Sequence, residues 1–322
     1  MTVAVVTGAT GQDGSYLCER LVAEGVELHA VVLADQPPHP WLSTARIHQI
    51  DLRDHSDLDR LVAETAPDEL YNLAGISSVA RSWDEPVLNA QVNAMSVAVL
   101  LRACWELQRK KGAPVRFVQA SSSEIFGRAS ESPQTEGTPI APTNPYGAAK
   151  SYAHQLVGVY RGLGLHASSC ILYNHESPRR PTTFVTRKIT DAVARISRGE
   201  QDRLSLGSLD TRRDWGWAPD YVDGLMLAAR HHQPLDVVLA TGETRSIGDF
   251  VDAAFRVVGI AQWRELVDLD DTLTRPVETV EQRGDATRAR DLLGWRATVD
   301  FDELVRRMVA ADLAVGDTAD VE

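Results

Sequence analysis

The sequence predicts an α/β fold in which a doubly wound parallel sheet is followed by a smaller α/β lobe. Short apolar runs alternate with longer amphipathic stretches over residues 1–173, and that alternation is typical of parallel β-α-β units. A glycine-rich turn directly follows the first apolar run, where a sheet of this kind binds its ligand. Beyond residue 173 the alternation loosens, which indicates a second lobe.

The expected elements follow from these patterns in chain order. Strands are predicted at residues 3–7, 28–33, 69–73, 115–119 and 167–172, because these runs are short and apolar. Helices are predicted near residues 14–24, 56–64, 88–109 and 145–163. After a polar, proline-rich stretch at 174–183, further helices are expected near 184–198, 219–231, 247–258 and 301–313.

A late apolar run at residues 237–240 is expected to return to the sheet of the first domain. We therefore divide the chain into a first domain at residues 1–173, a smaller lobe at 174–314 and a frayed tail at 315–322. A lobe that follows the sheet in this way is expected to close over a cleft at the carboxyl ends of the strands.

Composition excludes several kinds of partner. With 33 basic and 45 acidic side chains and a net charge of -12, the chain lacks the basic surface that nucleic acid or an anionic membrane requires. No apolar run reaches bilayer length and no signal peptide is evident, so a cytoplasmic protein is expected. Cys18, Cys104 and Cys170 are too widely spaced for a disulfide framework or a zinc site, and no bound metal is expected.

A dinucleotide site is predicted where the first strand meets the first helix. Gly8, Gly11 and Gly14 recur there with Gln12 and Asp13 between them, and this spacing allows a tight turn and the close approach of a pyrophosphate. The helix that begins at the turn directs its N-terminus at the phosphates. The alternative is a glycine-rich turn that only shapes the backbone.

Tyr146 and Lys150 are the predicted catalytic pair. They are four residues apart on an expected helix, so the phenol and the ammonium share one face. A free tyrosine has a pKa of about 10, and a nearby ammonium is expected to lower it. Ser122 ends the preceding strand, and a hydroxyl followed by Tyr-x-x-x-Lys is similar to the arrangement of short-chain dehydrogenases. The alternative for Tyr146 is a helix-surface tyrosine.

Glu124 adds a second group that can transfer a proton. An alcohol dehydrogenase or an epimerase needs one acid-base residue at the carbinol. Removing a proton beside a new ketone and protonating a departing hydroxyl requires another. A carboxyl group two residues beyond Ser122 supplies it. The alternative is an exposed loop glutamate.

Taken together, the motifs resemble those of the GDP-mannose 4,6-dehydratases, which are extended short-chain dehydrogenases/reductases with a Rossmann-like sheet. The resemblance extends from the first strand to about Asp312. It rests on the following segments: Gly11-Gln12-Asp13-Gly14-Ser15-Tyr16-Leu17, Ser121-Ser122-Ser123-Glu124, Pro145-Tyr146, Tyr173-Asn174-His175-Glu176-Ser177-Pro178-Arg179-Arg180, Phe184-Val185-Thr186-Arg187-Lys188-Ile189-Thr190, Arg212-Arg213-Asp214-Trp215-Gly216 and Arg275-Pro276-Val277-Glu278.

The resemblance implies a hydro-lyase reaction on a GDP-sugar. Tyr146 would take the proton of the C4 hydroxyl as hydride passes to a nicotinamide, with Lys150 beside it and Ser122 bonded to the C4 oxygen. Glu124 would remove the C5 proton, water would leave from C6, and the hydride would return to C6. The product would be a 4-keto-6-deoxy sugar.

The resemblance also assigns binding residues. For the cofactor it adds Asp51, Leu52, Leu73 and Ala74 to the glycine turn, with Asn93 bracing the backbone near the site. For the GDP portion of the substrate it implies Asn174, Lys188, Arg213, Arg275 and Glu278. Arginines suit this role because a guanidinium can bind a diphosphate through two parallel hydrogen bonds.

Three segments depart from the family pattern. The family has paired arginines for the 2′-phosphate of NADP after the second strand, whereas this chain has Leu33-Ala34-Asp35, and Asp35 could instead accept from the 2′-hydroxyl of NAD. Arg53 or Arg179 could replace the lost cations. The loop at 36–46 is shorter than the family segment that joins subunits, so a homo-oligomer is expected that is either a dimer or a tetramer, with the dimer favoured. Gly75-Ile76-Ser77-Ser78 also differs, near the sugar.

Two other functions remain open on the residues alone. One is a dehydratase or an epimerase that acts on a different nucleotide sugar. The other is a non-catalytic sensor that binds a dinucleotide, although a sensor has no need of both Tyr146 and Lys150.

Overall fold

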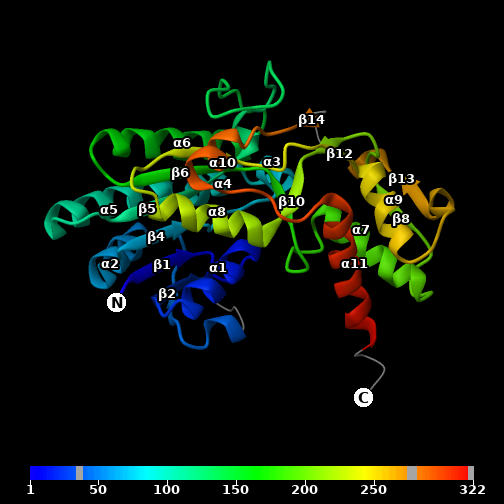
Figure 1. Cartoon of the computed structure of the whole chain (residues 1–322), viewed down its shortest axis with the longest axis horizontal. Helices are drawn as coiled ribbons and strands as arrows, with labels where there is room; N and C mark the ends of the chain where they lie inside the picture. Colours follow the sequence, from blue (N-terminus) through cyan, green and yellow to red (C-terminus); the bar gives the residue numbers. More distant parts are fainter. Residues whose placement is uncertain (34–38, 274–280, 318–322) are drawn as a thin grey trace.

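A seven-stranded sheet in which every strand pairing is parallel forms the frame of the molecule (Figure 1). The computed structural model describes residues 1–33, 39–273 and 281–317. The strand order is β11-β6-β5-β4-β1-β2-β3, so the chain winds outward in both directions from β1. The predicted doubly wound parallel sheet is confirmed.

The strands of this sheet are β1 (Val3–Thr7), β2 (Glu27–Val32), β3 (Arg46–Gln49), β4 (Glu69–Asn72), β5 (Arg116–Ser122), β6 (Ala167–Leu172) and β11 (Asp236–Leu239). β3 was not among the strands that the sequence predicts. It is an edge strand with largely exposed side chains, so it lacks the apolar pattern on which such a prediction relies. Its backbone pairs with β2 nonetheless.

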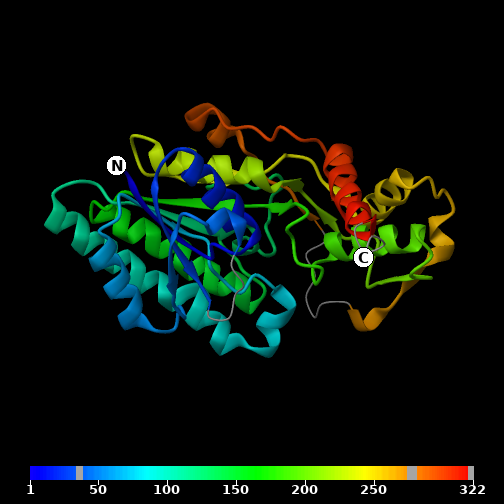
Figure 2. The same cartoon turned by 90° about the horizontal axis from the view of Figure 1, so that it is seen from below.

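Helices cover both faces of the sheet, as the view in Figure 2 shows. On one face lie α1 (Gln12–Ala23), α8 (Ala218–Arg230) and α10 (Thr287–Leu293). On the other lie α2 (His55–Thr65), α5 (Ser96–Lys111) and α6 (Pro145–Gly162). Each layer buries its apolar stripe against the strands, and this burial of apolar surface is the main stabilising contribution.

The helix predicted near residues 88–109 is built from three parts. They are α4 (Pro86–Ala90), the π-helical turn η2 (Gln91–Met95) and α5, with the short helix α3 (Val79–Asp84) before them. By length and hydropathy the run Pro86–Lys111 could span a membrane, so the expectation that no run is that long is wrong. Half of its most apolar window is buried, and it packs against α2 and α6.

The smaller lobe has a core of its own. α7 (Val185–Ser197), α9 (Ile247–Val257) and α11 (Phe301–Asp317) pack together through Phe250, Phe255 and their apolar neighbours. The short strands of the lobe are β7 (Asn174–Glu176), β8 (Leu204–Leu206), β9 (Arg212–Arg213), β10 (Trp215–Trp217), β12 (Arg245–Ser246), β13 (Val267–Leu269) and β14 (Glu281–Gln282). The short 3-10 turns are η1 (Pro40–Leu42), η3 (Ser123–Ile125), η4 (Trp263–Leu266) and η5 (Asp271–Leu273).

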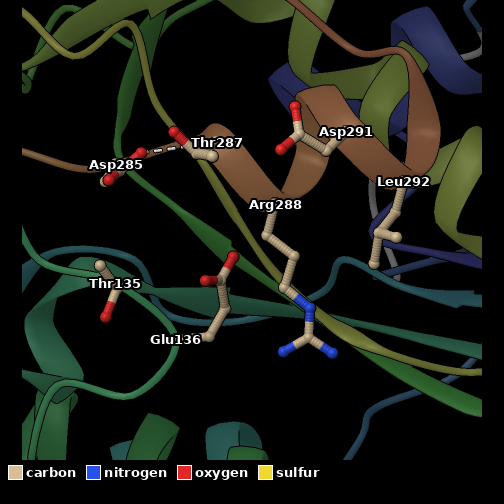
Figure 3. A pocket seen from close by; sticks show the side chains of 7 residues that line it. All are labelled: Thr135, Glu136, Asp285, Thr287, Arg288, Asp291 and Leu292. Carbon is tan, nitrogen blue, oxygen red and sulfur yellow. Dashed lines mark hydrogen bonds between the residues drawn. The ribbon is translucent and has the colours of Figure 1, made fainter.

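β11 occupies one edge of the large sheet although it follows much of the lobe in sequence. The Glu136 carboxylate accepts a hydrogen bond of 2.7 Å from the Val238 amide, so a side chain takes the place of a further strand. Burial raises the pKa of Glu136. Beside it, a cavity of about 420 Å³ opens between this loop and α10, and the side chains of Glu136 and Arg288 line it from opposite sides (Figure 3). The hydrogen bond from Val238 to Glu136 leaves fewer unpaired backbone groups at this strand edge, which reduces pairing with other chains.

The end of the chain departs from the expected tail. α11 continues to Asp317, so the segment that was expected to fray from residue 315 begins as helix. Residues 318–322 lie outside the described part of the chain.

Candidate active site

The glycine turn between β1 and α1 is shaped by close backbone contacts. Gly8 has a φ of +71°, and a Cβ there would lie 2.8 Å from the backbone of Ala74. A Cβ on Gly14 would lie 2.1 Å from the Gly8 carbonyl oxygen, so the helix could not approach the turn. Both glycines are therefore required by the fold itself.

Gly11 differs, because nothing within the protein demands a glycine there. It is exposed, its φ is -72°, and a Cβ would meet only the Gly8 carbonyl oxygen, at 3.3 Å. The open space lies at the N-terminus of α1, where unpaired amides attract an anion. The turn thus fits the pyrophosphate of a dinucleotide.

Gln12 and Asp13 reach away from the turn, to β7 of the lobe. The Gln12 side-chain amide donates to the carbonyl oxygen of His175 at 3.0 Å and accepts from the Ser177 hydroxyl at 2.9 Å. Asp13 lies 2.8 Å from Nε2 of His175. Both predicted cofactor residues therefore also join the first helix to the second lobe.

His175 is buried and has an acceptor at each ring nitrogen. Nδ1 lies 2.6 Å from the carbonyl oxygen of Tyr173, which can only accept, and Nε2 faces the carboxylate of Asp13. Although burial opposes both charges, the pKa of His175 is raised by Asp13, and the pKa of Asp13 is lowered by His175 and Arg180. The ring therefore carries a proton on each nitrogen and forms an ion pair with Asp13. Sequence reasoning quoted His175 within a motif but gave it no role.

Leu73 and Ala74 follow β4, next to the turn. Their backbone amides both donate to the Thr7 hydroxyl at 3.1 Å, and that hydroxyl donates to Asn72 at 2.7 Å. The two predicted cofactor residues are thus held beside Gly8 at the carboxyl ends of β1 and β4. Ligands of doubly wound sheets bind at this edge.

Asp51 and Leu52 follow β3 at the same edge of the sheet. Asp51 is chelated by the side chain of Arg53, whose hydrogen bonds lower the pKa of Asp51. Arg53 is thus engaged by a carboxylate. Asp35, the predicted partner of the 2′-hydroxyl, lies outside the described residues.

Arg179, the second cation considered for a 2′-phosphate, is also engaged. Its guanidinium bonds the Glu19 carboxylate at 2.6 Å and lies over the rings of Tyr16 and Trp41, at 4.0 and 4.7 Å from their centroids. The Ser15 hydroxyl accepts a further bond. The side chain is therefore fixed against α1.

The predicted catalytic residues lie together at the carboxyl end of β5 and on α6. α6 begins at Pro145, directly after Asn144, whose side chain caps the helix. Lys150 Nζ donates to the carbonyl oxygen of Ala120 at 2.9 Å and lies 5.8 Å from the centre of the Tyr146 ring. The Tyr146 hydroxyl is hydrogen-bonded to Ser122.

Burial dominates the titration of this pair. It raises the pKa of Tyr146 to about 12 and outweighs the hydrogen bond to Ser122, which lowers that pKa; Glu124 and Asp13 raise it further. It lowers the pKa of Lys150 to about 8. The expectation that Lys150 lowers the pKa of Tyr146 is therefore wrong for the protein alone, because both groups are removed from water and the nearby carboxylates oppose the phenolate.

Glu124 lies in η3, directly after Ser122, and its carboxylate is half-buried. Asn144 donates to one oxygen at 2.7 Å, and Gln282 of β14 donates to the other at 3.3 Å. Glu124 is therefore not a freely solvated loop glutamate. Sequence reasoning missed both amides, since only the folded chain brings Gln282 to this place.

The π-helical turn η2 places Asn93 beside the loop after β4. Its side chain accepts from the Ile76 amide at 3.2 Å and donates to the Ile76 carbonyl at 2.9 Å. A Cβ on Gly75 would come within 2.4 Å of the Asn93 oxygen. Asn93 thus braces this backbone, as the sequence predicts.

The predicted substrate residues are only partly brought together. Asn174 begins β7, which pairs with β10 through Trp215, and Arg213 lies two residues before that partner. Lys188 lies on α7, near enough to lower the pKa of Asp270, which hydrogen bonds from Thr272 lower further. Arg275 and Glu278 lie outside the described residues.

No metal site is formed by the described residues: no three His, Cys, Asp or Glu side chains among them are arranged to hold an ion. Cys18, Cys104 and Cys170 are buried and unpaired. Burial raises the pKa of Cys18 to about 12. Two cavities formed by described residues lie elsewhere, one beside Glu136 and one between α1 and α8.

With its all-parallel sheet, glycine turn and Tyr-Lys helix, this geometry is that of the extended short-chain dehydrogenases/reductases. A family model described as GDP-mannose 4,6 dehydratase matches residues 5–308. The chain belongs to the GDP-mannose 4,6-dehydratase family.

Relatives of this family match nearly the whole chain. GDP-mannose 4,6 dehydratase 1 of Arabidopsis thaliana is 41% identical, covering 97% of this chain and 90% of the relative. The GDP-mannose 4,6 dehydratase of Homo sapiens is 40% identical over 97% of this chain and 91% of its own length. That of Vibrio cholerae is 38% identical over 97% and 94%.

Solved structures share the fold. UDP-glucose 4-epimerase of Thermotoga maritima, solved with UDP-glucose, is 22% identical with a TM-score of 0.86, covering 99% of this chain and 100% of the other. UDP-glucose 4-epimerase of Thermus thermophilus, in complex with NAD, is 25% identical with a TM-score of 0.85, covering 97% and 99%.

Replacing Lys150 by methionine is expected to stabilise the cofactor-free protein. Burial of the ammonium lowers its pKa from 10.5 to about 8, so the charged form costs folding free energy at every pH below 10.5. Allowing for the Ala120 carbonyl left unpaired, the free energy of unfolding should rise by about 2 kcal/mol near neutral pH. Denaturant unfolding measures it.

The pH dependence supplies the check. The gain should be complete below pH of about 8 and should vanish as the pH approaches 10.5, because the unfolded chain then loses the same proton that the folded wild type has already lost. The exposed Lys110→Met variant is the control and should show no such dependence. A gain that persists at high pH would show that methionine packs better there for reasons unrelated to charge.

Proposed function

We propose that this protein dehydrates GDP-mannose to GDP-4-keto-6-deoxymannose, with a nicotinamide dinucleotide that is regenerated in each turnover. The observation that carries the proposal is the position of Glu124, a second proton-transfer group beside Ser122 and Tyr146, in a chain of this family. Relatives across almost its full length are named for this activity.

In this mechanism Tyr146 is the base at C4. Ser122 bonds the C4 oxygen, and Tyr146 accepts the hydroxyl proton, supported by the Lys150 ammonium on the same helix face. A nicotinamide dinucleotide, which the glycine turn between β1 and α1 would hold, would supply the acceptance of hydride from C4 and its return to C6. The raised pKa of Tyr146 in the protein alone disfavours its phenolate, and a positive charge bound beside it would favour the phenolate that acts as base.

Glu124 performs the elimination. A ketone at C4 acidifies the C5 proton, which the Glu124 carboxylate removes. The C6 hydroxyl then leaves as water after it has accepted that proton from Glu124. Tyr146 and Glu124 thus divide the work: one acts on oxygen at C4, and the other moves a proton between C5 and the C6 oxygen.

The GDP portion is assigned to Asn174, Lys188 and Arg213 of the lobe, with Arg275 and Glu278. Asn174 pairs with Trp215, two residues beyond Arg213 in sequence, which supports a shared ligand. Arg213 is largely buried, and a guanidinium in such a place binds a diphosphate strongly because water competes little.

Among alternative functions, a UDP-sugar epimerase is suggested by the fold of the solved neighbours. Epimerisation at C4 needs no carboxylate at C5, so Glu124 and its two amide donors favour dehydration. A non-catalytic sensor would not need the buried Lys150, whose charge is costly.

For the cofactor we propose that NAD is bound in preference to NADP, although the family resemblance points to NADP. A 2′-phosphate requires free cations. Leu33-Ala34-Asp35 supplies none in sequence, and Arg53 and Arg179 are each engaged by a carboxylate.

For the assembly we propose a homodimer built on the helices α4 to α6. Exposed apolar side chains gather there: Val87, Met95, Tyr152, Val159 and Leu163. α6 packs against α4 and η2, so the elements that carry these side chains adjoin one another, and a second copy could cover them.

The activity is tested with pure protein, GDP-mannose and a set of UDP and dTDP sugars. Mass spectrometry should show loss of one water from GDP-mannose. Tyr146→Phe should lower turnover by about 10²- to 10⁴-fold, since it removes the acid-base group. Glu124→Gln should let reduced cofactor accumulate without product. Glu131→Gln, an exposed carboxylate in the next loop, is the control. Reaction of only a UDP or dTDP sugar would overturn the nucleotide assignment.

Cofactor choice is tested by titrating NAD and NADP side by side. NAD should bind more tightly, by about 10-fold or more, because the phosphate would approach Asp35 without a free cation. Asp35→Arg should reverse the order. Tighter binding of NADP by the wild-type protein would contradict the proposal.

The assembly is tested by light scattering of purified protein. Wild-type protein should have the mass of a dimer, and Val159→Glu should yield a monomer because it places a charge in the apolar interface. Leu227→Glu, at an exposed position on α8 on the other side of the sheet, should leave the dimer intact. A monomeric wild type would refute the interface.

A further inference from the structure

The carboxylate of Glu124 is held by an amide at each oxygen. Asn144 Nδ2 donates to Oε2 at 2.7 Å, and Gln282 Nε2 donates to Oε1 at 3.3 Å. The two donors come from sites far apart in the chain: Asn144 precedes the catalytic helix α6, and Gln282 lies on β14. Together they restrict rotation of a side chain that would otherwise turn freely in a half-buried position.

Other hydrogen bonds fix which end of each amide faces Glu124. The Asn144 oxygen accepts from the Gly147 backbone amide at 2.8 Å, so its NH₂ group must point the other way. The Gln282 oxygen accepts from the Ser123 hydroxyl at 3.4 Å. Both side chains are buried, with 7% and 3% of their surface exposed, so water offers them little alternative.

Gln282 is also part of the strands that carry the predicted substrate residue Arg213. In the parallel pairing of β14 with β9, Gln282 is the partner of Arg213. The carbonyl oxygen of Gln282 accepts from the Asp214 amide at 3.1 Å, and the Asp214 carboxylate accepts from the Gly284 amide at 3.3 Å. One residue thus contacts Glu124 through its side chain and the Arg213 segment through its backbone.

We propose that Gln282, together with Asn144, is a positioning residue that aims the Glu124 carboxylate at the C5 proton. This inference rests on the proposed function, because it gives Glu124 the elimination step. Proton transfer needs the donor and acceptor atoms within hydrogen-bond reach and aligned, and a carboxylate that rotates loses that alignment. Among the described residues no hydrogen bond joins Tyr146 to Gln282, so loss of the clamp should affect the elimination more than the oxidation at C4.

The test is a single-turnover comparison of wild type and Gln282→Leu with GDP-mannose and bound cofactor. Absorbance of the reduced cofactor reports C4 oxidation, and mass spectrometry reports loss of water. The variant should form reduced cofactor at the wild-type rate and accumulate it, while product formation falls by about 10- to 100-fold with KM unchanged. Deuterium at C5 should then slow product formation more in the variant than in wild type.

A second variant approaches Glu124 from the other side. Asn144→Ser keeps an oxygen that can cap α6 but is too short to reach Glu124, so it should give the same accumulation. The control is Gln134→Leu, a buried glutamine that accepts from the Arg283 amide at 3.2 Å, next to Gln282. Gln134→Leu should change the rates of C4 oxidation and of water loss by the same factor, so reduced cofactor should not accumulate.

The outcomes separate the two proposals. If wild-type protein releases no 4-keto-6-deoxy product from GDP-mannose, the proposed function fails and the role of Gln282 with it. If wild type is active but Gln282→Leu and Asn144→Ser slow both steps equally, or neither, the proposed function stands and the clamp is refuted. Accumulated reduced cofactor in both variants supports the clamp.

Discussion

The buried ion pair between Asp13 and His175 is the contact on which the arrangement of the site depends. It joins the first turn of α1 to β7, two segments separated by 162 residues in sequence. An ion pair removed from water is stable only if its remaining polar atoms are satisfied. Here the Tyr173 carbonyl satisfies the second ring nitrogen, and Gln12 adds two neutral hydrogen bonds alongside. These contacts therefore tie the dinucleotide turn to the start of the lobe.

Burial of Tyr146 and Lys150 shifts their pKa values, and it also costs folding free energy. Lys150 and Tyr146 are titratable groups with pKa values shifted in opposite directions, to about 8 and about 12, by the same removal of water. Perturbed groups of this kind gather where chemistry is done, since a structure selected for stability alone would leave such groups exposed. Glu124 follows the carboxyl end of β5 and differs from Tyr146 and Lys150. Each of its two carboxylate oxygens accepts a hydrogen bond.

Much of the fold could be predicted from the sequence, because apolar runs report directly on buried strands such as β1 and β5. The exposed edge strand β3 was missed because its residues carry no such pattern. In the site, spacing alone indicated Gly8, Gly11, Tyr146 and Lys150, because each of the two motifs is complete within a few residues.

The residues that the sequence could not reveal depend on distant partners. His175, Asn144 and Gln282 gain their roles from side chains brought together only by folding; Gln282 and Glu124 are 158 residues apart. The direction of the Tyr146 pKa was also mistaken, since it depends on how deeply the helix is buried rather than on the spacing to Lys150. A sequence motif indicates which chemical groups lie close together along the chain. Burial and hydrogen bonds between distant residues become visible only in the folded structure.

The return of β11 to the sheet has a consequence for how the protein is made. A ribosome releases β6 well before β11, so one edge of the growing sheet stays open while the first half of the lobe is synthesised. During that interval β6 presents unpaired backbone amides and carbonyls, which invite pairing with other chains. β6 can pair with β11 only after residues 236–239 have emerged. Glu136, which is synthesised earlier, then accepts a hydrogen bond from the Val238 amide on the outer side of β11.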